Sequence, residues 1–183
     1  MPAESASIMT AEELERVHLP GKSTELVRGR LLVREPPGTY HGKIAAKLSF
    51  LVASFVYAHD LGDVFGQDTG FKIASDPDTV RAPDFAFLAR ERASAIRPRG
   101  YAAVAPDLVV EIASPDDRPG EVLAKVGDWL DAGVRLVWVI DPQRAEAHVH
   151  RPDGGLDLIG AGGALDGEAV LPGFSCQLSR LFD

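Results

Sequence analysis

Two carboxylates in strand-like apolar runs are the residues of this sequence best suited to chemistry. Asp84 lies in the run 80–88, VRAPDFAFL, and Glu111 lies in the run 106–113, PDLVVEIA. A carboxylate inside a buried strand is costly unless it is paired, protonated or bound to a cation. Two such acids on successive strands point to a divalent-metal site for phosphodiester chemistry. Either acid alone fits a loop cap or an arginine partner equally well.

The alternation of side chains along a strand indicates where the two acids point. Successive side chains of an extended strand lie on opposite faces. Asp84 therefore shares a face with Ala86, and Glu111 shares a face with Val109 and Ala113. If the two strands are neighbours, both carboxylates project into one pocket. Mg²⁺ suits this arrangement, with Mn²⁺ as the alternative, because it takes one or two protein carboxylates and leaves its other positions to water and phosphate.

Lys125 is the third candidate, and it belongs to a predicted helix. It falls beside Trp129 and Val122 on the border of the apolar stripe of that helix. A lysine in this position can lay its stem along the core and bring its ammonium toward the sheet. There it would orient a nucleophilic water or stabilise charge in a transition state. The alternative is an ordinary lysine whose ammonium reaches solvent.

The spacing of apolar residues predicts the elements that must hold these side chains. Residues 41–59 form the longest predicted helix, and a second helix over 120–132 ends at Gly133. The nearly continuous apolar run 134–140 indicates a central strand covered on both faces. A capping-box pattern at Thr10–Glu13 opens a short helix to about Val17. Further strands are expected on either side of a glycine turn in 25–33, near Val64, and over 71–74, 83–88, 108–112, 145–150, 156–159 and 168–171.

These elements define an α/β or α+β fold with a mixed sheet flanked by helices. The chain has 183 residues, enough for one domain with a proper core. We expect a flexible N-terminus over residues 1–9 and a single domain over residues 10–183. No glycine-rich phosphate loop or dinucleotide fingerprint occurs at a strand-to-helix turn, which disfavours nucleotide-cofactor folds.

Composition and the N-terminal sequence predict the compartment. The single cysteine, Cys176, rules out an internal disulfide and fits a reducing environment. Residues 1–8 lack the basic and apolar regions of a signal peptide. No apolar run approaches the roughly 20 residues that a membrane span requires. We therefore expect a cytoplasmic protein that makes no use of a membrane.

Charge is distributed unevenly along the chain. The net charge of −8 argues against a protein that coats nucleic acid non-specifically. The segment 81–99 is nevertheless basic, and it could receive a phosphate or remain a solvated arginine-rich loop. Its five arginines are Arg81, Arg90, Arg92, Arg97 and Arg99, against the two acids Asp84 and Glu91.

Several short blocks occur together in a recognisable order. They are ELVRGRL at 25–31, His41, Pro83–Asp84, VEIASP at 110–115, Lys125, AGV at 132–134 and VWVIDP at 137–142. This series resembles the Uma-type restriction endonuclease family of the PD-(D/E)XK nuclease superfamily, over about residues 10–182. The resemblance implies a restriction-endonuclease-like core, in which a mixed sheet is flanked by helices.

The resemblance also implies an activity and a set of roles. It implies a Mg²⁺-dependent DNA endonuclease that hydrolyses phosphodiester bonds, with Asp84 and Glu111 as the metal ligands. Glu25 would be a further carboxylate that binds the metal or holds water. His41 would act as a proton shuttle or phosphate contact, unless it is only part of a helix terminus. Gln67 and Asp68 precede a predicted strand and could reach the same pocket, but they are assigned no role.

One departure from the superfamily pattern concerns the lysine. The usual lysine lies two residues after the second acid, where this chain has Ala113. Lys125 matches a family variant in which the lysine has moved to the following helix. The resemblance further implies a homodimer in which each active site cuts one DNA strand. The missing strand lysine and the acidic net charge favour the alternative, a catalytically inactive nuclease-like domain that binds a partner.

No helix-turn-helix or zinc-finger pattern marks a separate recognition domain. Loops such as residues 90–99, or a partner, would therefore supply any sequence preference. Hydrolysis of another phosphodiester is a third possibility that the sequence leaves open.

Overall fold

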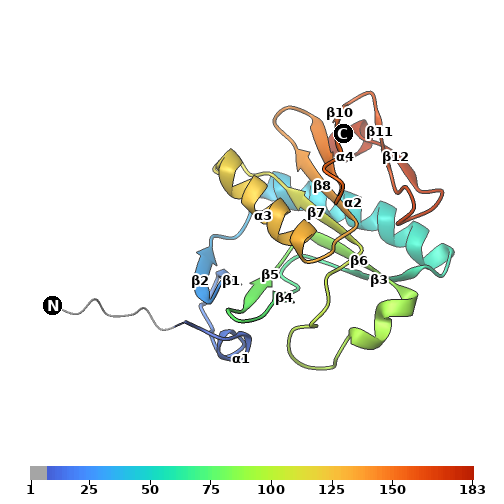
Figure 1. Cartoon of the computed structure of the whole chain (residues 1–183). Helices are drawn as coiled ribbons and strands as arrows, with labels where there is room; N and C mark the ends of the chain where they lie inside the picture. Colours follow the sequence, from blue (N-terminus) through green and yellow to red (C-terminus); the bar gives the residue numbers. More distant parts are fainter. Residues whose placement is uncertain (1–7) are drawn as a thin grey trace.

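A computed structural model describes residues 8–183 (Figure 1). The flexible N-terminus predicted over residues 1–9 lies outside the described residues except for Ile8 and Met9. The backbone N–H of Met9 donates to the carbonyl of Gly29 at 2.9 Å. Within residues 8–183, no helix combines the length and apolar character that crossing a membrane requires.

The centre of the fold is a six-stranded mixed sheet with the order β10-β9-β8-β7-β6-β3. Strands β7 (Leu108–Ile112) and β8 (Leu136–Asp141) are parallel, and helix α3 (Pro119–Asp131) connects them. A parallel pair needs such a crossover, whereas the other neighbours in this sheet are antiparallel. The remaining strands are β3 (Gly62–Phe65), β6 (Phe85–Ala89), β9 (Glu146–His150) and β10 (Leu156–Gly160).

A second sheet has four antiparallel strands in the order β2-β1-β5-β4. The chain leaves β5 and enters β6 of the main sheet through only three residues, Ala82–Asp84. The two sheets therefore meet at Asp84. The strands of the second sheet are β1 (Ser23–Val27), β2 (Arg30–Arg34), β4 (Phe71–Ala74) and β5 (Thr79–Arg81).

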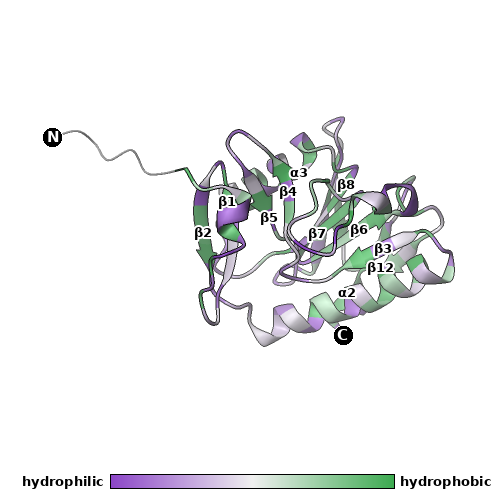
Figure 2. Cartoon of the chain, turned by 90° about the horizontal axis from the view of Figure 1, so that it is seen from below, coloured by the Kyte–Doolittle hydropathy of each residue, from purple (hydrophilic) through white to green (hydrophobic). Residues whose placement is uncertain are grey.

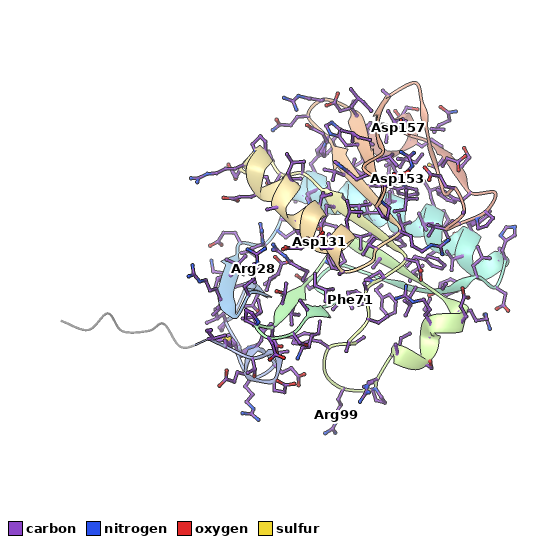
Figure 3. All side chains as sticks on the ribbon, viewed as in Figure 1. Arg28, Phe71, Arg99, Asp131, Asp153 and Asp157 are labelled. Carbon is purple, nitrogen blue, oxygen red and sulfur yellow. The ribbon has the colours of Figure 1, made fainter. Side chains whose placement is uncertain are left out.

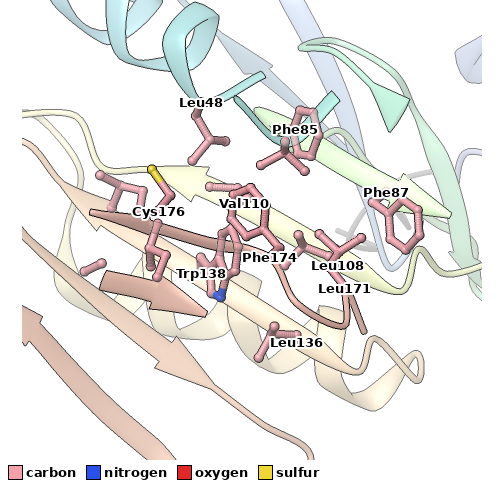
Figure 4. Close-up of a cluster of buried hydrophobic side chains, with 14 of the residues drawn as sticks. Leu48, Phe85, Phe87, Leu108, Val110, Leu136, Trp138, Leu171, Phe174 and Cys176 are labelled. Carbon is pink, nitrogen blue, oxygen red and sulfur yellow. The ribbon is translucent and has the colours of Figure 1, made fainter. Parts of the chain in front are cut away.

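Helix α2 (Thr39–Ala58) covers one face of the main sheet. Its apolar residues recur at helical spacing and bury one side of the helix. Figure 4 shows Leu48 of α2 in one cluster with Phe85, Val110 and Trp138, which come from three neighbouring strands. This packing forms the larger of the two cores of the main sheet.

Helix α3 covers the opposite face of the main sheet. Val126 and Trp129 of α3 pack on Ala86, Val109 and Val137, which alternate along their strands with the residues that face α2. The two central strands are thus buried on both sides, which explains their continuous apolar runs. The predicted mixed sheet with flanking helices is confirmed.

The C-terminal segment corrects one prediction. Residues 168–171 form a turn rather than a strand, because the N–H groups of Val170 and Leu171 both donate to the carbonyl of Gly167. Glu168 takes a positive φ of 49°, and its N–H donates to Asp166 Oδ1 at 2.6 Å. The turn joins β11 (Ala164–Asp166) to β12 (Ser175–Gln177) in a separate two-stranded sheet, followed by α4 (Ser179–Phe182).

The N-terminal helix α1 (Ala11–Leu14) has the predicted capping box but is shorter than predicted. The N–H of Glu13 donates to Thr10 Oγ1 at 3.2 Å, and the N–H of Thr10 donates to Glu13 Oε2 at 2.8 Å. The helix packs with the second sheet through the buried side chain of Leu14. A short 3₁₀ helix, η1 (Arg90–Ala95), follows the end of β6.

Candidate active site

A cavity of about 460 Å³ opens where the two sheets meet. Strands β1 and β2, the start of α2, the residues just before β6, the end of β7 and the first turns of α3 contribute to its wall. All five side chains singled out from the sequence line it, namely Glu25, His41, Asp84, Glu111 and Lys125. The fold thus brings together residues that are as far as 100 positions apart in the chain.

The two acids lie on neighbouring antiparallel strands. The β6–β7 register pairs Phe85 with Val110 and Ala86 with Val109. The same register, extended by one residue, sets Asp84 opposite Glu111. Opposite residues of an antiparallel pair have Cβ atoms about 5 Å apart on the same face. The prediction of neighbouring strands is confirmed, although β6 begins one residue after Asp84.

Asp84 is held by three donors from three parts of the chain. Its Oδ2 accepts from the N–H of Ile112 at 2.7 Å and lies 3.2 Å from His41 Nε2, while its Oδ1 accepts from Gln67 Nε2 at 3.1 Å. Burial by itself raises the pKa of this carboxyl, but the hydrogen bond and charge of His41 outweigh burial and lower the pKa. Asp84 is therefore ionised at neutral pH.

Glu111 is nearly out of solvent, with 8% of its surface exposed. Its Oε1 accepts from Trp129 Nε1 and its Oε2 accepts from Lys125 Nζ, both at 2.8 Å. Burial raises the pKa of Glu111 to about 7, against the opposing charge of Lys125 and with the help of the negative charge of Asp84. At neutral pH this carboxyl is therefore balanced between its two protonation states.

Lys125 reaches Glu111, as its place on the border of the helical stripe predicted. Its Nζ donates to Glu111 Oε2 at 2.8 Å and to the carbonyl of Ala82 at 3.1 Å, and lies 3.3 Å from Glu25 Oε1. Burial lowers the pKa of Lys125, but the charges of Glu111 and Glu25 outweigh burial and raise it. The ammonium stays charged, and the role assigned to it remains a prediction.

Glu25 is more firmly paired than a free metal ligand would be. Its Oε2 accepts from Arg81 Nη1 at 3.0 Å and Arg34 Nε at 3.3 Å, and its Oε1 accepts from the N–H of Ala82 at 2.8 Å. Burial raises its pKa, but Lys125 and Arg81 bring the pKa below its ordinary value. This environment favours a structural role for Glu25, in which it anchors the ammonium of Lys125.

His41 lies in the first turn of α2 and is more than a part of the helix terminus. Its Nε2 lies 3.2 Å from Asp84 Oδ2, and its Nδ1 lies 3.3 Å from Gln67 Nε2. Burial lowers the pKa of His41, but the hydrogen bond and charge of Asp84 raise it above its ordinary value. The imidazole and the carboxylate thus form a coupled pair at the wall of the cavity.

Gln67 lines the cavity, as does Asp68, but the sequence assigned it no role. Both hydrogens of its amide NH₂ are used, one toward His41 Nδ1 and one toward Asp84 Oδ1. It therefore fixes the relative orientation of the other two side chains. Its only signal in the sequence is a polar side chain just before a predicted strand, which is too common to indicate a site.

The basic segment 81–99 does not behave as one surface. Arg81 is buried and joins two acids, because its Nη2 donates to Asp128 Oδ2 at 2.6 Å in addition to its bond with Glu25. Arg92 Nη1 donates to Asp107 Oδ1 at 2.9 Å. Much of the positive charge in this segment is therefore neutralised within the fold.

The rest of the segment lies away from the cavity. Asp84 precedes β6, whereas η1 and residues 96–99 follow the other end of that strand. Figure 3 shows Arg99 at the lower edge of the molecule, on the loop after η1. None of residues 90–99 lines the cavity. The expectation that this loop supplies sequence preference stays a prediction, and any DNA contact that it makes would lie outside the cavity.

The donor set of the cavity fits a hydrated Mg²⁺ or Mn²⁺ ion. Within residues 8–183, no group of three or more His, Cys, Asp or Glu side chains is arranged to hold a metal. Mg²⁺ needs only one or two carboxylates and keeps several waters. Each carboxylate oxygen has two lone pairs, so Asp84 and Glu111 both keep acceptor capacity beyond their present hydrogen bonds.

The arrangement of strands and helices matches that of a solved nuclease-like protein. A crystal structure from Anabaena variabilis ATCC 29413, described as "a putative nuclease belonging to DUF820", superposes with a TM-score of 0.81. The match covers 95% of this chain and 97% of that chain at 20% sequence identity, and so shows a shared fold. No curated protein matches this chain.

The sequence itself defines the family. Residues 11–179 match the profile of the Uma2 family, which is described as "Putative restriction endonuclease". The match spans nearly the whole described chain. The protein therefore belongs to the Uma2 family, and the resemblance drawn from the sequence blocks is confirmed.

Proposed function

We propose that this protein is a Mg²⁺-dependent DNA endonuclease that hydrolyses phosphodiester bonds in the cavity between the two sheets. One observation carries the proposal. A single cavity sets Asp84 opposite Glu111 and places the Lys125 ammonium 2.8 Å from Glu111. The two carboxylates can bind a metal ion, and the ammonium of Lys125 is held beside them. This combination suits the hydrolysis of a phosphate ester by water. Membership of the Uma2 family points to the same class of reaction.

Asp84 and Glu111 would hold the ion, with Mn²⁺ as the alternative to Mg²⁺. Such an ion, when bound, polarises a phosphoryl oxygen and lowers the pKa of a coordinated water. The task of the chain is to present both carboxylates on one face in their ionised forms. Asp84 is ionised at neutral pH, and Lys125 opposes the effect of burial on Glu111.

Lys125 would stabilise the negative charge that develops on the phosphate. Its three hydrogens have three acceptors at present, namely Glu111, Glu25 and the carbonyl of Ala82. A substrate oxygen must therefore replace one of these acceptors. Glu25 is the natural one to give way, because at 3.3 Å it is the most distant and it keeps its bonds to the arginines.

His41 and Gln67 would act as positioning residues for Asp84. The imidazole and the amide each bind one oxygen of the Asp84 carboxylate. They fix its rotation about the side-chain bond, and hence the direction in which its remaining lone pair points. The hydrogen bond and charge of Asp84 also raise the pKa of His41 above its ordinary value, although burial lowers it.

The test is cleavage of supercoiled and single-stranded DNA by the purified protein in Mg²⁺ or Mn²⁺. We expect nicking or linearisation that EDTA, Asp84→Asn and Glu111→Gln each abolish. Asp131→Asn is the matched control, because Asp131 is an exposed carboxylate at the end of α3 outside the cavity (Figure 3). Absence of cleavage by the wild type in both metals, or full activity in Asp84→Asn, would overturn the proposal.

A second candidate is a catalytically inactive domain that binds DNA or another partner. It is favoured by the internal pairing of the cavity, where Arg81, Arg34 and Lys125 already satisfy Glu25, and Lys125 satisfies Glu111. DNA binding that does not depend on metal, without any cleavage, would support this candidate.

We also propose that the protein works as a two-fold homodimer, so that two cavities can act on the two strands of a duplex.

A further inference from the structure

Arg34 differs from the other basic side chains around the cavity, because most of its hydrogen-bond donors are free. Its Nε donates to Glu25 Oε2 at 3.3 Å, and its Nη1 lies 4.0 Å from Asp117 Oδ1, which is too far for a hydrogen bond. Within residues 8–183, neither Nη atom has a hydrogen-bond acceptor. A guanidinium has five N–H donors, so four of them remain for a ligand.

The other cations near the cavity are already occupied. Lys125 has an acceptor for each of its three hydrogens. Arg81 is buried between Glu25 and Asp128. Among the described residues that line the cavity, Arg34 is therefore the one lysine or arginine that can bind an anion without giving up a present partner.

The pairing of β1 with β2 directs Arg34 to this wall. The register sets Arg34 opposite Ser23 and Leu32 opposite Glu25, so Arg34 is the diagonal neighbour of Glu25 on the same face. Diagonal neighbours lie about 7–8 Å apart, within reach of a long side chain. Strand β2 is the outer strand of its sheet and lies at the edge of the molecule (Figure 2). The Arg34 side chain is 38% exposed there, so a ligand can reach it from solvent.

Glu25 determines where the free donors of Arg34 point. The Glu25 side chain is only 3% exposed, and its Oε2 binds Nε of the guanidinium. Because the guanidinium is planar and rigid, this bond leaves the edge formed by the two Nη atoms for another partner. Asp117 lines the cavity and is the acid near Nη1, so this edge faces the cavity.

The charge of the cavity makes these donors important for an anion. Eight of the residues that line the cavity are Asp or Glu, against two that are Lys or Arg. An anion is repelled by most of such a wall and binds best where a cation has free donors. The paired N–H groups of a guanidinium edge match two oxygens of one phosphate.

Arg34 and Lys125 are placed for different phosphates. Glu25 Oε2 binds Arg34, whereas Glu25 Oε1 faces Lys125, so the carboxylate lies between the two cations. Lys125 is the cation that bonds to Glu111. A phosphate at Asp84 and Glu111 therefore meets Lys125, and Arg34 meets a second phosphate beyond Glu25.

We propose that Arg34 binds the phosphate next to the scissile one in the same strand, so that the cavity selects a polynucleotide over an isolated phosphodiester. This inference rests on the proposed function, because it places the scissile phosphate at Asp84 and Glu111. It names the feature that the site recognises, namely two successive backbone phosphates. Arg34 is thus a residue that determines specificity rather than a catalytic residue.

The first test compares two competitors of a fluorescent single-stranded oligonucleotide by fluorescence anisotropy in Ca²⁺, which binds the same hard oxygen donors as Mg²⁺. One competitor is a thymidine dinucleotide with one phosphate, and the other is a trinucleotide with two. We expect the wild type to bind the trinucleotide about tenfold more tightly or better, as one hydrogen-bonded charge pair provides. Arg34→Met should remove most of this preference.

Arg30→Met is the matched control, because Arg30 is an exposed arginine of the same strand that does not line the cavity. It should keep the preference for the trinucleotide. Arg34→Lys keeps the charge but not the two-donor edge, and should restore only part of the preference. A preference that survives Arg34→Met, or a wild type that binds neither competitor, would overturn the proposal.

The second test uses a variant that should gain affinity, which loss of folding cannot mimic. Asp117→Asn removes the negative charge near Arg34 Nη1 and keeps an oxygen that can accept from the N–H of Ser114. It should strengthen binding of the trinucleotide. Asp116→Asn is the control, because Asp116 also lines the cavity but forms no ion pair with Arg34 in the described structure. Equal gains in both variants would show a general effect of charge and contradict the proposal.

This inference and the proposed function can fail separately, because the readout here is binding rather than cleavage. A preference that depends on Arg34, in a protein that never cleaves DNA, would keep the phosphate site and overturn the nuclease. Cleavage by the wild type, with the same preference in Arg34→Met, would overturn the phosphate site alone.

Discussion

Glu111 receives one hydrogen bond on each oxygen, both from the same face of α3. Trp129 and Lys125 are four residues apart, so one turn of helix supplies a neutral donor and a charged donor to the same carboxylate. The neutral indole N–H of Trp129 can donate to Glu111 in either protonation state, whereas the charged ammonium of Lys125 favours the ionised carboxylate. Burial opposes ionisation, and the pKa near 7 is the outcome.

This balance makes stability depend on pH. Between pH 4.5 and about 7 the unfolded chain has lost the Glu111 proton, while the folded protein keeps it. The free energy of unfolding therefore falls as pH rises through this range. His41 adds to the fall, because its raised pKa gives stability that is lost at higher pH. The Glu111 part is at most about 3–4 kcal/mol, since its pKa rises from 4.5 to about 7 and one pKa unit is worth roughly 1.4 kcal/mol.

Urea unfolding at several pH values measures this contribution. Glu111→Gln should flatten the dependence between pH 4.5 and about 7, leaving the shallower slope due to His41. Equal slopes in the wild type and the variant would show that Glu111 does not titrate in this range.

Lys125→Met tests the buried ion pair. The variant leaves Glu111 and Glu25 without their shared ammonium, and we expect a loss of about 3 kcal/mol in the free energy of unfolding. The double variant Lys125→Met/Glu111→Gln should recover part of the loss, because it removes the unpaired charge. Lys22→Met is the control, since Lys22 forms an exposed pair with Glu35 and should cost under about 1 kcal/mol. Equal costs for the two single variants would contradict the assignment.

At the level of residues, the sequence predicted those site residues that stand out as polar side chains within an apolar pattern. Asp84 and Glu111 interrupt apolar runs, and Lys125 lies at the edge of a helical stripe. Gln67 and Arg81 break no such pattern. Their partners come from other strands, so only the folded chain shows what they bind.

At the level of elements, the hydrogen bond by which Trp129 of α3 binds Glu111 of β7 can be tested by substitution. Trp129→Phe removes the indole N–H that binds Glu111 and keeps most of the ring volume. Trp138→Phe is a close control, because Trp138 is equally buried and its Nε1 has no hydrogen-bond partner. We expect Trp129→Phe to lower the free energy of unfolding by about 1–3 kcal/mol more than Trp138→Phe. Similar losses would show that the bond to Glu111 adds little.

The longer elements followed from the sequence, and the short ones less so. Helices α2 and α3 repeat their apolar spacing over several turns, which leaves little ambiguity. The segment 168–171 has an apolar composition that suits a strand, but Val170 and Leu171 are buried in a tight turn. Over only four residues, a buried turn and a buried strand have similar patterns of apolar residues. Only the hydrogen bonds to Gly167 separate them.

At the level of the whole molecule, the cavity is a product of topology. The sequence predicted one mixed sheet, whereas β5 and β6 belong to two different sheets although three residues separate them. The second sheet supplies Glu25 and Arg81, and the main sheet supplies Glu111. Which sheet a strand joins depends on pairing with strands distant in the sequence, so no local pattern predicts that β5 and β6 belong to different sheets.

A metal bound only by the folded protein should stabilise the whole molecule. The gain is RT ln(1 + [L]/Kd), about 2.7 kcal/mol when the metal concentration is 100 times Kd. Millimolar Mg²⁺ or Mn²⁺ should therefore raise the Tm of the wild type. Asp84→Asn should abolish the rise, whereas Asp131→Asn should keep it. An equal rise in all three proteins would indicate non-specific binding to this acidic chain.

The most direct measurement is a crystal structure determined in Mn²⁺ with anomalous scattering data. The account predicts one anomalous peak in the cavity, about 2.0–2.2 Å from an oxygen of Asp84 and an oxygen of Glu111. Glu111→Gln crystals should lose the peak or show it much weakened. An empty cavity at millimolar Mn²⁺, or a peak bound elsewhere in the molecule, would contradict the claim that these two carboxylates form the metal centre of a nuclease.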